Sequence, residues 1–163
     1  NQNIGIIGVC LGAQLLAYAA GGDVETLKSG FPLKPSPEIG WSEISSKSYN
    51  SNDEISCLLK KPMKVLHWHA DRIILPVKIE LLASSKICKE QLFKLRDKAY
   101  GLQFHVESDE NMIYEWIKKY KDFIISALGE DGLETLTIEE NKMEKKTLNS
   151  RKSFIKKLIE VTK

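Results

Sequence analysis

A cysteine between glycines and a distant histidine–glutamate pair could together make and break a covalent bond. Cys10 lies in the segment Gly-Val-Cys-Leu-Gly, and a much later segment, Gly-Leu-Gln-Phe-His-Val-Glu, carries His105 and Glu107. A thiolate is a strong nucleophile, an imidazole can accept and return its proton, and a carboxylate can orient the imidazole. The residue types therefore predict a nucleophile, a general base and acid, and an orienting acid.

The residues around Cys10 predict a sharp corner between a strand and a helix. Residues 4–7 are apolar and mostly β-branched, which favours a buried strand, whereas residues 13–20 are strong helix formers. The flanking glycines would let the backbone turn without Cβ clashes, so the thiol would project from a nucleophile elbow. The Leu11 amide would then donate to an oxyanion. The alternative is a small buried cysteine in a glycine-rich turn of some other α/β protein.

A second strand would bring His105 to the elbow. Residues 99–105 indicate a strand, and in an extended chain His105 and Glu107 project on the same side. The carboxylate can then hold one imidazole nitrogen while the other takes the proton of the thiol. A lone histidine at a strand end is usually structural or solvated, but the pairing with the elbow favours catalysis.

These segments resemble the class I glutamine amidotransferases, in the branch of stand-alone proteins similar to the amidotransferase domain of GMP synthase. The resemblance covers residues 3–128 and implies a three-layer, flavodoxin-like α/β fold with a mostly parallel sheet flanked by helices. It also implies one partial domain over residues 1–163, with its core at 3–128 and a helical extension at 130–163. The motifs that carry it are Gly-Val-Cys-Leu-Gly-Ala-Gln at 8–14, Leu-Leu-Ala at 15–17, Gly21-Gly22, Glu-Ile-Gly-Trp at 38–41, Leu-His-Trp-His-Ala-Asp at 66–71, Leu75-Pro76, Leu-Leu-Ala-Ser-Ser at 81–85, Gln-Leu-Phe at 91–93 and Tyr-Gly-Leu-Gln-Phe-His-Val-Glu at 100–107.

The resemblance implies a reaction with glutamine that needs no cofactor. Cys10 would attack the side-chain amide and form a thioester, and His105, oriented by Glu107, would protonate the departing ammonia and then activate water. The ammonia acceptor would belong to a separate synthetase subunit or to an unseen part of the protein. The residues implied in substrate binding are Leu11, whose amide is also the oxyanion donor, Gln14, Trp68 and Ala70.

The sequence departs from the family pattern in three places. Val106 stands where many members have proline, and Ala70 where glycine is common, but neither change removes a reacting group. The family also has several strands and helices before the elbow, including a glycine-rich loop with a second oxyanion donor. Because the sequence opens at Asn1, just before the elbow strand, we expect an N-terminally truncated chain without its first strands. Losing one such donor costs about 10²- to 10³-fold in turnover.

Composition predicts a globular protein of a reducing compartment. The chain has 163 residues, of which 42% are hydrophobic and 28% charged, and 24 basic residues nearly balance 22 acidic ones. This balance favours no nucleic acid partner, and no apolar run approaches the ~20 residues of a membrane helix. Three cysteines without regular spacing, and no signal segment, predict a cytoplasmic protein in which Cys57 and Cys88 serve packing.

Short strands followed by helices are predicted for the rest of the chain. Residues 108–128 have a helical apolar period, with Ser108 as N-cap, Gly129 as terminator, and Trp116 and Tyr120 in the core. The last segment has an apolar face at residues 154–162 and lysines outside it, which favours a helix packed on the sheet; the alternative is contact with a membrane or partner. Further strands are predicted at 24–27, 41–44, 64–69, 79–84 and 91–95, and a surface loop or helix start at 45–54.

Two other chemistries compete with an amidotransferase reaction. His67 and His69 with Asp71 could be drawn as metal ligands, but alternate positions on a strand are equally explained by strand pairing, so we predict no metal. The chain has no glycine loop with a lysine for phosphates, which excludes a fused ATP-dependent activity from the prediction.

Three functions remain open at the level of sequence. The first is a glutamine amidotransferase or glutaminase that releases glutamate and ammonia. The second is a hydrolase of other γ-glutamyl amides or peptides. The third is a catalytically silent binding or regulatory module on the same scaffold, which the joint presence of Cys10, His105 and Glu107 disfavours.

Overall fold

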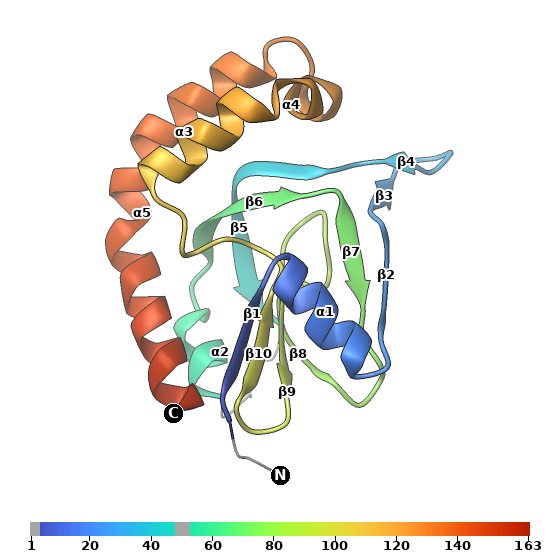
Figure 1. Cartoon of the computed structure of the whole chain (residues 1–163), viewed down its shortest axis with the longest axis vertical. Coiled ribbons are helices and arrows are strands. Elements are labelled where there is room, and N and C mark those ends of the chain that lie inside the picture. Colours follow the sequence, from blue (N-terminus) through green and yellow to red (C-terminus); the bar gives the residue numbers. More distant parts are fainter. Residues whose placement is uncertain (1–3, 48–52) are drawn as a thin grey trace.

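The computed structural model describes residues 4–47 and 53–163, apart from the side chain of Asn141. Figure 1 shows a curled sheet with α1 against one side and the long α5 running along another. The elements in chain order are β1 (Ile6–Val9), α1 (Leu11–Ala19), β2 (Asp23–Thr26), β3 (Lys28–Ser29), β4 (Lys34–Pro35), β5 (Glu38–Ser46), α2 (Glu54–Leu58), β6 (Met63–His69), β7 (Asp71–Ile74), β8 (Glu80–Ser84), β9 (Leu92–Leu95), β10 (Ala99–Leu102), α3 (Glu110–Lys119), α4 (Lys121–Leu128) and α5 (Gly132–Thr162).

The main sheet confirms the α/β class but is mixed. Its six strands lie in the order β1-β10-β9-β8-β5-β6, while β2 pairs with β7 and β3 with β4 in two small sheets. Within the main sheet only β1 and β10 are parallel, and the other neighbours are antiparallel. The description "mostly parallel" therefore does not fit these described strands. Short connections join β8, β9 and β10, and such connections permit only antiparallel neighbours.

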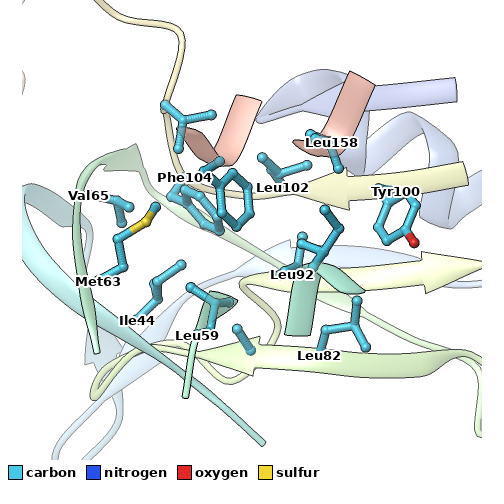
Figure 2. Packing of buried hydrophobic residues seen from close by; sticks show 14 residues of the cluster. Ile44, Leu59, Met63, Val65, Leu82, Leu92, Tyr100, Leu102, Phe104 and Leu158 are labelled. Carbon is cyan, nitrogen blue, oxygen red and sulfur yellow. The ribbon is translucent and has the colours of Figure 1, made fainter. Parts of the chain in front are cut away.

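Two apolar clusters pack on opposite faces of β9 and β10. Ala13 and Ala17 of α1 cover Phe93 on one face. On the other face, Tyr100 and Leu102 join a larger cluster. Figure 2 shows how Leu158 of α5 lies over this cluster beside the strand residues. The larger cluster comprises Ile44, Ile55, Leu59, Met63, Val65, Leu82, Ala83, Leu92, Tyr100, Leu102, Phe104, Val106, Phe154 and Leu158.

The helical region after β10 differs from the prediction in two details. The helix predicted over residues 108–128 is interrupted at Tyr120, which separates α3 from α4. Its N-cap is Asp109 rather than Ser108, because the Asp109 carboxylate accepts a hydrogen bond from the Met112 amide at 2.8 Å. Gly129 ends α4 with a positive φ, as predicted.

The first strand is more exposed than the sequence predicts. β1 lies at the edge of the sheet, and β10 is its partner among the described strands. Ile6 and Ile7 are exposed, although an apolar, β-branched run favours a strand buried on both faces.

The remaining predictions have mixed outcomes. The strands predicted at 64–69, 79–84 and 91–95 correspond to β6, β8 and β9, and the strand predicted at 41–44 lies within the longer β5. In the stretch 45–54, β5 continues to Ser46 and Asp53 caps α2, while residues 48–52 lie outside the described residues. Cys88 is buried as predicted, but Cys57 is exposed on α2, so packing does not account for it. Among the described helices, none combines the length and apolar character needed to cross a membrane.

Candidate active site

Cys10 occupies a strained turn between β1 and α1. Its φ is 49°, a value that residues with a side chain rarely adopt and that recurs at functional sites. A Cβ at Gly8 would lie 2.6 Å from the carbonyl oxygen of Gly12, so crowding explains the first glycine of the predicted elbow. A Cβ at Gly12 would meet no described atom within 4 Å. The second glycine is therefore not required by the turn.

The parallel pairing of β1 and β10 brings the two predicted segments together. Val9 and Leu102 are paired at the carboxyl ends of these strands, so the segments that follow β1 and β10 leave the sheet side by side. The Cys10 amide donates to the Leu102 carbonyl at 2.7 Å, and the His105 amide donates to the Leu66 carbonyl of β6 at 2.8 Å. These bonds hold the nucleophile candidate and the imidazole on adjacent segments.

His105 is bonded to Glu107 and lies against Cys10. Nδ1 of His105 is 2.7 Å from a Glu107 carboxylate oxygen, and the other carboxylate oxygen accepts from the Val106 amide at 3.0 Å. Burial lowers the pKa of His105, which is 7% exposed, but hydrogen bonds to Cys10 and Glu107 outweigh it and raise the pKa to about 9. For Glu107, burial raises the pKa, but the hydrogen bond and the charge of His105 outweigh it and bring the pKa below its usual range. The pair favours an imidazolium beside a carboxylate.

Gln103 contacts the sulfur of Cys10 and was not singled out by the sequence. Its Nε2 lies 3.7 Å from the Cys10 Sγ, and its Oε1 accepts from Nε2 of Gln14 at 3.3 Å. The side chain is fully buried, and its backbone amide donates to the Gln91 carbonyl. A glutamine inside the strand predicted at 99–105 is the signal that would have found it, because a buried amide demands hydrogen-bond partners.

The chain matches a known protein family over most of its length. The family model described as Glutamine amidotransferase class-I matches residues 1–121. The chain belongs to the class I glutamine amidotransferases.

Relatives and solved structures agree with this family. The chain is 35% identical over 107 residues to a glutamine-hydrolyzing GMP synthase subunit of Methanobrevibacter smithii, and the match covers 64% of this chain and 51% of that protein. The corresponding protein of Methanothermobacter thermautotrophicus, which has the same name, is 37% identical over 106 residues, covering 64% and 52%. The chain thus spans about half the length of these relatives.

Among solved structures, a glutamine amidotransferase from Thermotoga maritima superposes with a TM-score of 0.76 at 28% identity, covering 98% of this chain and 64% of that one. A glutamine amidotransferase from Methylobacillus flagellatus, at 22% identity and a TM-score of 0.69, covers 95% and 64% and supports the fold alone.

In this class I glutamine amidotransferase, the four residues predicted to bind substrate differ in how they relate to Cys10. Leu11 is the first residue of α1, where backbone amides lack helical partners. The Trp68 carbonyl lies 3.9 Å from the Cys10 sulfur. Gln14 reaches the site through Gln103, as described above. The Ala70 carbonyl already accepts from the Leu27 amide at 2.9 Å, so this oxygen is engaged within the protein.

Aromatic rings lie on one side of the candidate active site. The Trp116 ring meets the His105 ring edge to face, with centroids 4.9 Å apart, and lies 5.4 Å from the Trp68 ring. The prediction placed Trp116 and Tyr120 in the core. Instead, Trp116 is half-buried and Tyr120 is exposed beside Trp68. Trp116 therefore covers the imidazole as well as packing α3.

A buried polar cluster supports the strand that carries Trp68. Glu38 of β5 faces His69 of β6 in the register, and Glu38, His69 and Cys88 each bring one potential ligand atom within 4.8 Å of the others. Nε2 of Gln91 donates to Glu38 at 2.8 Å and lies 3.3 Å from Nε2 of His69. Nδ1 of His69 bonds the backbone carbonyl of Asp71 at 2.8 Å. These hydrogen bonds already use the His69 nitrogens and a Glu38 oxygen.

This cluster differs from the metal set considered in the sequence. Asp71 contributes its carbonyl rather than its carboxylate, and neither ring nitrogen of His67 has a hydrogen-bond partner among the described residues. Burial lowers the pKa of His67 to about 4. Burial raises the pKa of Glu38, but the His69 hydrogen bond and the nearby His67 and Ser85 outweigh it and lower the pKa. The arrangement fits an ionised Glu38 that fixes the end of β6 beside Cys10.

Proposed function

We propose that the chain hydrolyses the side-chain amide of glutamine through a thioester on Cys10. The observation that carries the proposal is the contact of Cys10 with His105, whose other ring nitrogen is held by Glu107 at 2.7 Å. Cys10, His105 and Glu107 then act as nucleophile, general base and acid, and orienting group. Membership of the class I glutamine amidotransferases supports glutamine as the substrate class.

The proposed reaction balances with water as the only other reactant. The Cys10 sulfur attacks the amide carbon while His105 holds the thiol proton, and this proton leaves on ammonia as the carbon–nitrogen bond breaks. Water then gives its proton to His105 and attacks the thioester carbon. The carbon–sulfur bond breaks, the proton returns to Cys10, and glutamate leaves. The Leu11 amide is the oxyanion donor in both steps.

Substrate binding and ammonia transfer form the finer part of the proposal. Gln14 and the backbone at Trp68 and Ala70 hold the amino-acid end of glutamine. The Ala70 carbonyl oxygen takes no part in this binding, because it already accepts a hydrogen bond within the protein. The relatives named as subunits of a GMP synthase support delivery of the ammonia to a separate synthetase subunit. A cytoplasmic location remains a prediction from the sequence.

Intact-mass measurement after treatment with an electrophilic glutamine analogue tests this proposal. We expect one adduct on Cys10, protection by glutamine, and no adduct in Cys10→Ala. The exposed Cys57 serves as an internal control for unspecific alkylation. In parallel, glutamate and ammonia release should fall by roughly 10²- to 10⁴-fold in His105→Ala, the usual contribution of a general acid and base.

The same measurements separate the alternatives. Labelling of Cys57 with Cys10 untouched would defeat the proposal. Faster ammonia or amine release from γ-glutamyl amines than from glutamine would favour the γ-glutamyl hydrolase. Absence of both adduct and turnover would favour the silent module.

A further inference from the structure

Arg151 of α5 is a buried cation beside the loop that carries Glu107. Its side chain is 2% exposed and is the largest of the fully buried side chains among the described residues. Its guanidinium lies 5.3 Å from the centre of the Trp41 ring. A buried guanidinium without partners costs several kcal/mol, so its position depends on the groups that it bonds.

The partners of Arg151 divide into two sets. Within α5, Nε donates to the Thr147 hydroxyl at 3.1 Å and Nη2 pairs with Glu144. Toward the active site, Nη1 donates to the carbonyls of Val106 at 3.3 Å and Ser108 at 2.6 Å. The first set fixes the guanidinium on the helix. The second set holds the backbone carbonyls on both sides of Glu107 by hydrogen bonds.

Residues 103–109 join β10 to α3 outside regular secondary structure, with a single bridge from His105 to Leu66. Phe104 and Val106 of this segment are buried in the main cluster, but no backbone–backbone hydrogen bond holds the described residues 106–108. The Glu107 carboxylate must leave this segment in the direction of His105 to make its 2.7 Å contact. A displacement of about 1 Å in such a support can cost roughly 10²-fold in rate.

We propose that Arg151 is a positioning residue of the active site, which fixes the direction of the Glu107 carboxylate toward His105 by holding the Val106 and Ser108 carbonyls. α5 lies beyond residues 1–121, so the family match assigns no role to it. The kinetic part of this inference rests on the proposed function, whereas the structural part does not.

The test compares Arg151→Met with Lys152→Met, a change at an exposed neighbour on the same helix. NMR titration of the labelled His105 ring reports its bond to Glu107 whether or not the protein turns over glutamine. We expect the pKa of His105, raised to about 9 in the native chain, to fall in Arg151→Met toward that in Glu107→Gln. Cys10 and His67, the other titrating groups that act on His105, are unchanged in these variants.

Kinetics supply the second measurement. We expect kcat for glutamine to fall about 10- to 100-fold in Arg151→Met with KM nearly unchanged, because the substrate contacts remain. Lys152→Met should match the native chain in both measurements. A native His105 titration curve in Arg151→Met would overturn the inference.

Two further outcomes bear on the role of Arg151. If Arg151→Met does not fold, Arg151→Lys is used, since the ammonium keeps the charge but reaches fewer carbonyls; a smaller shift of the same sign supports the inference and no shift overturns it. If no variant, including the native chain, turns over glutamine, the proposed function fails, and the His105 titration alone still decides the role of Arg151.

Discussion

His105 is the residue whose protonation state decides what the site can do. Its hydrogen bonds to Cys10 and Glu107 favour the protonated ring and raise its pKa from 6.5 to about 9. The pair therefore stabilises the folded chain fully below about pH 6.5, and this contribution is lost as the pH rises through about 9. The proton that must leave with ammonia is on His105 in the same range.

The pH dependence of glutamine hydrolysis should follow this proton. We expect kcat/KM to fall on the alkaline side with an apparent pKa near 9, the pKa to which its hydrogen bonds raise His105. Glu107→Gln should move this limb to lower pH, because it removes the charge that favours the imidazolium. Rates measured from pH 6 to 10 at constant ionic strength check it. An alkaline limb at the same pH in both chains would contradict the role given to Glu107.

At the level of residues, the sequence predicts the reacting groups more successfully than the groups that support them. Cys10, His105 and Glu107 have side chains whose chemistry is recognisable in any context, and the structure brings the three together. Gln103 and Arg151 are ordinary polar residues whose importance comes from partners far away in the sequence. Arg151 also lies in a lysine-containing helix, where sequence alone favours an exposed cation.

At the level of elements, the elbow depends on one glycine. Gly8→Ala would put a Cβ within 2.6–2.9 Å of three backbone atoms of residues 12 and 13, which cannot yield as a flexible side chain would. We expect it to cost about 1–3 kcal/mol in the free energy of unfolding. Gly12→Ala meets no described atom and lies in α1, so it should be neutral or stabilise by up to about 1 kcal/mol.

Urea unfolding of the two variants, followed by circular dichroism, measures this difference. Equal destabilisation by both alanines would contradict the assignment of the turn to Gly8. A loss confined to Gly12→Ala would point to a packing partner of α1 that the described residues do not include.

The sequence predicts elements by local pattern, and its failures have physical causes. β6, β8 and β9 lie in segments that the sequence predicts as strands, because short runs rich in apolar residues favour a sheet. The break at Tyr120 was missed because the apolar period continues across it, and a period does not report where a helix changes direction. The mixed sheet was missed for a related reason, since strand order and direction depend on long-range pairing.

At the level of the whole molecule, α5 connects the core to the active site. Phe154 is 1% exposed in the main cluster and meets the Phe104 ring edge to face, with centroids 6.1 Å apart. Phe104 directly precedes His105. We therefore propose that residues 130–163 fold together with the sheet as part of one unit, rather than as a separable extension.

Phe154→Ala and Ile159→Ala distinguish these two architectures. The first change removes a ring from the main core and should cost about 3–5 kcal/mol in the free energy of unfolding. The second removes a side chain that is 43% exposed on the same helix and should cost less than about 1 kcal/mol. Urea unfolding monitored by near-ultraviolet circular dichroism follows the packing of the sheet. If α5 were separable, both variants would leave that transition at the native midpoint; if it is part of one unit, Phe154→Ala moves a single cooperative transition to lower urea, because the helix and the sheet share the same buried surface.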